Sequence, residues 1–160
     1  MKDSSQIVKE LLRVGTVTVK DPENMCCRVT FSDTPTNAVT SYWLPVLVTR
    51  AHGDTYYDLP DIGSKVLCAF LPNGHEEGFI LGSYYPKGKA PEIDGDIYCH
   101  AFKDGTYIEY NRKEHRLFAS CVGDVEITAQ NNMKINADNV SIKAQGIINL
   151  LASQIIAQEG

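Results

Sequence analysis

The chain has 160 residues, enough for one ordinary domain with an extension. Apolar residues make up 43% of it, which is typical of a folded protein and excludes wholesale disorder. The net charge is −5, and residues 14–86 carry four Lys or Arg against eight Asp or Glu, so a nucleic-acid backbone is not expected as the main partner.

Residues 1–13 are predicted to form an N-terminal arm. A short amphipathic helix is expected over 4–13, capped by Ser4 or Ser5, with apolar residues on one side. A helix this short is marginal alone, so it is expected to dock on the barrel or on a neighbouring protein.

Residues 14–86 are predicted to form an all-β domain. Apolar residues mark the expected strands, and turn signals such as Pro-Asn-Gly at 72–74 separate them. These strands cover residues 14–19, 27–31, 43–49, 65–71 and 78–81. Five strands in so short a segment indicate a small closed barrel such as an OB-fold. The long loop 50–63 should lie over the barrel, with Tyr56 and Tyr57 partly packed.

Residues 87–121 are predicted to form a linker and a β-hairpin neck. Pro86 to Pro91 has the composition of a linker, and Asp104-Gly105 is a strong hairpin signal between strands at 97–102 and 106–110. A further strand at 115–120 is expected to pair back on this hairpin.

Residues 122–160 contain a repeat, which we call the stem. Each unit of seven or eight residues has an apolar residue, a spacer, an apolar residue, a spacer and an alanine, followed by polar turn residues. If each unit is a short strand, its apolar residues face one way. Repeats of this kind stack instead of building a globular core.

A single column of such strands would leave an apolar face in water and two unpaired edges. Three columns around a threefold axis close both, which predicts a homotrimer with an all-β triple-stranded β-helix or β-prism stem. A two-sheet dimer is the alternative, but it leaves free edges. The predicted trimer core consists of Val125, Ile127, Ala129, Met133, Ile135, Ala137, Val140, Ile142, Ala144, Ile148, Leu150 and Ile155.

An ordered set of motifs runs along nearly the whole chain. It comprises Gly15-x-Val17, Arg28-Val29, Trp43-Leu44-Pro45, Pro60-Asp61-Ile62-Gly63-x-x-Val66, Gly74, Gly78-x-x-Leu81-Gly82-Ser83, Tyr85, Asp104-Gly105-Thr106, Ile108, Tyr110 and the stem entry at 123–129. With the repeat behind it, this set resembles the spike proteins of contractile-tail baseplates, the baseplate assembly protein V family of phages and related bacteriocins.

The resemblance implies a homotrimeric spike, made in the bacterial cytoplasm and assembled into the baseplate of a virion or phage-tail-like particle. Its OB-fold domains would sit on a hub protein, with Trp43, Tyr56 and Tyr57 as contact candidates, and its stem would pierce the target cell envelope. Many members bind iron at the tip through a His-x-His pair. Here the last histidine is His115, so no metal and no other cofactor is expected, and a separate tip-capping protein is possible.

Other functions are weaker alternatives. His52 with Asp54 and Asp58, and the run 75–77, are expected to be solvated loops, so no catalytic residue is assigned and the chain is not expected to be an enzyme. Aromatic residues of the barrel could stack nucleic-acid bases, but the acidic balance opposes this. A trimeric receptor-binding fibre or adhesin remains the main alternative function.

Overall fold

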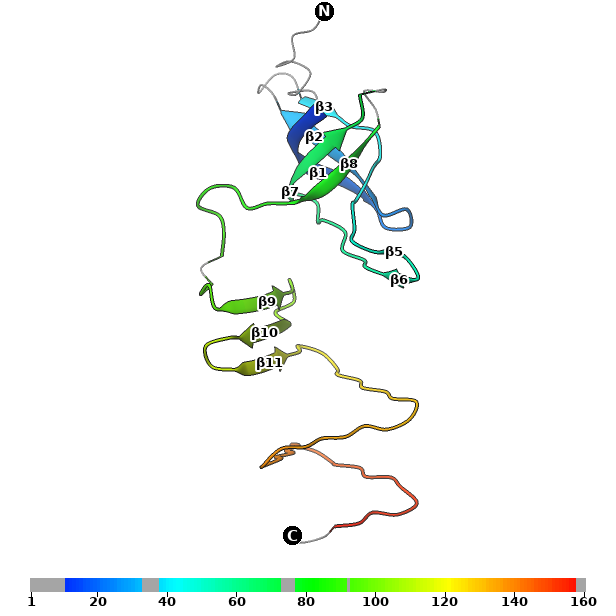
Figure 1. Ribbon diagram of the computed structural model, residues 1–160, viewed down its shortest axis with the longest axis vertical. Helices are drawn as coiled ribbons and strands as arrows, with labels where there is room; N and C mark the ends of the chain where they lie inside the picture. Colours follow the sequence, from blue (N-terminus) through cyan, green and yellow to red (C-terminus); the bar gives the residue numbers. More distant parts are fainter. Residues whose placement is uncertain (1–10, 33–37, 73–76, 92, 158–160) are drawn as a thin grey trace, which may run out of the picture. The chain divides into compact units, whose positions relative to one another are not determined.

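The computed structural model describes residues 11–32, 38–72, 77–91 and 93–157. Within these ranges the chain forms eleven strands, and Leu11, directly before the first of them, has helical geometry (Figure 1). It divides into two compact units, Met1–Asp94 and Gly95–Gly160. The boundary between the units falls inside the segment predicted as the neck. No helix in the described ranges has the length and apolar character needed to cross a membrane.

The first unit is built on one six-stranded sheet. Its strands are β1 (Leu12–Asp21), β2 (Cys26–Ser32), β3 (Ala38–Thr40), β4 (Leu44–Pro45), β7 (Lys65–Phe70) and β8 (Gly78–Ser83). The order is β3-β2-β1-β7-β8, and β4 pairs with β2. Two short strands, β5 (Ala51–His52) and β6 (Asp54–Thr55), form a separate hairpin.

The sheet curls until its two ends meet. Cys27 of β2 pairs with Leu44 of β4, and the next residue but one, Val46, bridges to Ile80 of β8. The N–H of Leu47 also donates to the carbonyl of Ile80 at 2.8 Å. The five strands β1, β2, β4, β8 and β7 therefore close into a small barrel, which agrees with the predicted OB-fold.

The barrel encloses one apolar core to which every one of its strands contributes. The fully buried side chains are Val17, Cys27, Val29, Phe31, Leu44, Val66, Cys68 and Ile80. Along β2 and β7 they alternate with residues that are less buried, mostly half-buried, as expected for strands with one face toward the core. The guanidinium of Arg13 lies 4.2 Å from the centre of the Phe31 ring and covers one end of this core.

The prediction of an N-terminal helix over 4–13 is wrong for its last two residues. Residues 1–10 lie outside the described ranges, but Leu12 and Arg13 belong to β1, where they pair with Ala69 and Cys68 of β7. A barrel strand satisfies backbone N–H and C=O groups that a marginal helix end would leave unpaired, which explains why β1 begins this early.

The third predicted strand, 43–49, is shorter than expected. Only Leu44–Pro45 pairs with β2 as a strand. The next residue, Val46, donates its N–H to the Met25 carbonyl at 3.0 Å and also bridges to Ile80 of β8. The short strands β3, β5 and β6 were not predicted. Strands of two or three residues are too short to produce a recognisable alternation.

In the second unit three strands form an antiparallel sheet, which we call the neck sheet. They are β9 (Ile97–Ala101), β10 (Tyr107–Asn111) and β11 (Arg116–Ser120), in the order β11-β10-β9 (Figure 1). The predicted Asp104-Gly105 turn joins β9 to β10, with Gly105 at a φ of 93° and Asp104 accepting the N–H of Thr106. The hairpin and the added third strand are as predicted.

Candidate assembly surfaces

The stem changes direction at regular intervals. Bends lie at 122–123, 130–131, 138, 145–146 and 153. Between them run straight segments of six residues each, 124–129, 132–137, 139–144 and 147–152 (Figure 1). The last residue of each segment is the alanine that closes a sequence unit, namely Ala129, Ala137, Ala144 and Ala152. The backbone therefore follows the repeat that the sequence predicts.

No strand pairing occurs within a single copy of residues 121–157. The short strands predicted there would pair between the three chains of a trimer, so a single copy leaves that prediction untested. Their backbone donors and acceptors need partners from elsewhere, and so do their side chains.

Every one of the twelve predicted trimer-core residues is exposed in the single chain. Ile142, for example, is 69% exposed. Nothing in the described part of this chain covers these residues, so the structure leaves their predicted role in a trimer untested. Soluble proteins seldom leave so many large apolar side chains open to water in one segment, so this segment is a candidate surface for association.

The neck sheet has two faces of different chemistry. Because directly paired residues on antiparallel strands point to the same side, the register places Tyr98, His100, Ile108, Tyr110, Leu117 and Ala119 on one face. We call this the aromatic face. The sequence analysis gave it no role, although the alternation of Ile108, Tyr110, Leu117 and Ala119 in the predicted hairpin was a usable signal.

The opposite face of the neck sheet carries an ion-pair network. The carboxylate of Glu109 is 8% exposed and lies 3.1 Å from the Arg116 guanidinium, which also lies 3.3 Å from Glu114. The pKa of Tyr107 is raised, first by its side-chain hydrogen bond with Cys99, then by burial and by the neighbouring Glu109. This face therefore satisfies its polar groups within one chain.

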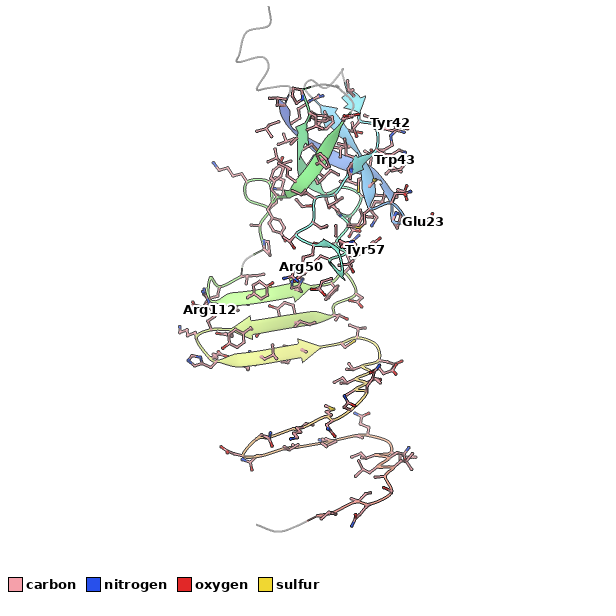
Figure 2. All side chains as sticks on the ribbon, turned by 45° about the vertical axis from the view of Figure 1, so that its right-hand side comes forward. Glu23, Tyr42, Trp43, Arg50, Tyr57 and Arg112 are labelled. Carbon is pink, nitrogen blue, oxygen red and sulfur yellow. The ribbon has the colours of Figure 1, made fainter. Side chains whose placement is uncertain are left out.

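The three hub-contact candidates do not form one cluster. Trp43 is half-buried beside Tyr42, whereas Tyr57 lies at a separate place after β6 (Figure 2). Tyr56 and Tyr57 are each 63% exposed, so the expectation that they are partly packed is wrong. The Tyr57 hydroxyl donates to the carbonyl of Pro22 at 3.2 Å, which holds the ring against the β1–β2 turn without burying it.

Tyr56 lines a groove of about 410 Å³ on the barrel. The other walls come from the segment 46–49 and from Leu81 to Ser83 of β8, and Asp58 is the one charged residue among the lining residues. Of the three candidates, Tyr56 thus has a concave apolar surface beside it.

The structure describes in full only one of the two polar clusters considered for catalysis. Asp54 is paired with Arg50 at 2.6 Å across the small β5–β6 hairpin that contains His52. His75 and Glu76 lie outside the described ranges. Within those ranges, no three His, Cys, Asp or Glu side chains gather in a way that could hold a metal ion.

Comparison with known proteins assigns the barrel. Residues 13–85 match the model of the Type VI secretion system/phage-baseplate injector OB domain. The chain is also 23% identical over 157 residues to the spike protein of Escherichia phage P2, a match that covers 98% of this chain and 72% of that protein. Residues 13–85 therefore match the injector OB domain of contractile injection machines, and the chain as a whole is similar to a phage baseplate spike protein.

Proposed function

We propose that this chain is the structural spike at the centre of a contractile-tail baseplate and that it works as a homotrimer. The observation that carries the proposal is the stem, with its regular bends, its unpaired backbone and its uncovered apolar side chains. Three copies wound around one axis supply both the missing backbone partners and the missing cover.

Burial of the stem is the main source of stability in this proposal. Each large apolar side chain that becomes fully buried contributes roughly 1.5–3 kcal/mol. The six Val, Ile and Met residues between Val125 and Ile142 repeat in all three chains, so folding of the stem and association become one event.

The mechanism is mechanical. When the sheath contracts, the spike is driven through the target cell envelope, and the interlocked strands of the stem resist compression. No covalent bond is made or broken, so the chain is proposed not to be an enzyme, and no metal or cofactor takes part.

The proposed partners follow from this place in the particle. The OB domain attaches to the baseplate hub, with Trp43, Tyr56 and Tyr57 as contacts, and Tyr56 beside its groove is the strongest of the three. A separate protein caps the apolar end of the stem. Nucleic acid is not a partner, because the barrel segment carries twice as many acidic as basic residues.

Particles that carry a stem variant test the function. We expect wild-type particles to permeabilise target cells, measured as loss of membrane potential. Particles with Ile142→Asp should contract their sheaths without permeabilising, whereas the neighbouring Ser141→Asp should behave as wild type. If Ile142→Asp particles lack a trimeric spike and still permeabilise cells normally, piercing by this stem is ruled out.

A further inference from the structure

We infer that the aromatic face of the neck sheet is a second intersubunit surface, on which the same face of the two other copies packs, while the Glu109–Arg116 face stays outside. This inference rests on the proposed trimer and extends its interface upstream of the stem, to Tyr98.

The aromatic face is open and almost without charge in the single chain. Tyr98, Ile108, Tyr110 and Leu117 are all large and exposed, and Leu117 is 74% exposed. The strands contribute no carboxylate, lysine or arginine to this face, and the His100 ring makes an edge contact with the Tyr98 ring, with the ring centres 5.9 Å apart.

The other face is unsuited to burial against copies of itself. Arg116 and Glu114 are both more than half exposed, and three such networks meeting at an axis would have to be dehydrated together. The aromatic face has no such cost, since bringing three of them together places apolar and ring surfaces in contact.

The neck sheet continues directly into the stem, which indicates that other copies of this chain cover the aromatic face. β11 ends at Ser120, and the first bend of the stem follows at 122–123 in the same compact unit. Chains that meet along the stem must therefore already be close together at β11. Moreover, β9 and β11 each pair on one side only within the described ranges, so both outer edges of the sheet remain open to strands of other copies.

Adjacent residues of β11 provide a matched test. Leu117 and Phe118 are both large and exposed, but they point to opposite faces of the sheet. In the full-length protein, Leu117→Lys should lower the guanidinium midpoint of trimer dissociation, because three ammonium groups would meet in a dry interface. Phe118→Lys should leave it unchanged, since the new charge lies opposite Glu109.

The outcomes separate this inference from the proposed trimer. A monomeric wild-type protein refutes the trimer itself. A trimeric wild type whose midpoint is unaffected by Leu117→Lys refutes only the neck interface, and sensitivity to Phe118→Lys alone means that the opposite face is the buried one.

A variant that is expected to stabilise the trimer distinguishes a lost interface from simple misfolding of Leu117→Lys. His100→Phe keeps a ring beside Tyr98 and replaces the polar ring nitrogens with apolar carbon atoms. If the face is buried in the trimer, the His100 ring loses its hydration on assembly, so an apolar ring at this position favours the trimer. His100→Phe should therefore raise the guanidinium midpoint of trimer dissociation. A midpoint identical to that of the wild type would contradict the inference.

Discussion

At the scale of single residues, Gly15 decides how closely β1 can approach β2. A Cβ at this position would run into the Val29 side chain and would lie 2.9 Å from both a Phe31 ring carbon and the Thr30 carbonyl. Val29 and Phe31 are core residues and the Thr30 carbonyl is part of the sheet, so none of these three groups can move aside without disturbing the barrel.

We expect Gly15→Ala to destabilise the OB domain by about 1–3 kcal/mol, the usual cost of overpacking a core. Urea unfolding followed by the fluorescence of Trp43 measures the change. Gly95→Ala is the control, because a Cβ there meets no atom within 4 Å. Equal stabilities of the two variants would mean that the strands are less tightly packed than described.

The two core thiols show a second effect of burial. Cys27 and Cys68 are fully buried, and burial raises the pKa of Cys68 to about 11, against an ordinary value of 9.0. Since the folded state holds this proton more tightly than the unfolded state, stability present below pH 9 is lost as the pH rises toward 11.

At about pH 8, both core thiols should therefore resist alkylation until the barrel unfolds, whereas the exposed Cys121 should react in any copy that is not assembled. Mass spectrometry of iodoacetamide-treated protein, with and without denaturant, distinguishes the sites. Rapid labelling of Cys68 in the folded protein would contradict the described core.

At the scale of elements, the stem segments offer a strict comparison between neighbouring residues. Ile142 and Ser141 are both exposed in the single chain, so only a partner chain can make substitutions at the two positions differ in effect. Ile142→Asp should abolish the trimer, because carboxylates from three chains would meet at a dry axis at a cost of several kcal/mol each. Ser141→Asp should assemble normally.

Sedimentation velocity of the two purified variants measures this difference. A soluble, trimeric Ile142→Asp protein would mean that the inward face of the stem has been assigned to the wrong residues. Loss of assembly in Ser141→Asp as well would show a general intolerance of charge instead of a defined inward face.

The same scale shows which elements the sequence could predict. The strands β1, β2, β7 and β8 were located by their apolar residues and by the turn signals between them, and strict alternation runs only through β2, from Cys27 to Phe31. β3, β5 and β6 depend on pairing partners distant in sequence and have too few residues for a pattern. The position of the Tyr57 ring could not be predicted either, because its hydroxyl donates to the carbonyl of Pro22, which is distant in sequence.

Of the candidate surfaces, the sequence predicted the stem but not the aromatic face. The stem residues were found because their period is visible in the sequence itself. The aromatic face of the neck sheet was missed, because its members come from three strands and only the register, such as Tyr110 opposite both Tyr98 and Leu117, brings them to one side.

At the scale of the whole molecule, we propose that a single chain cannot pair the backbone of its stem or bury the apolar side chains there. The barrel has a closed sheet and a buried core, whereas residues 121–157 have neither. Association must therefore supply what the second unit lacks, and dilution should not yield a stable monomer with an ordered stem.

The most direct test is the mass of the full-length protein in solution, measured by multi-angle light scattering on a size-exclusion column. The account predicts a species of three times the 17.7 kDa chain mass that persists on dilution to micromolar concentration. A stable folded species with the mass of a single chain would contradict it.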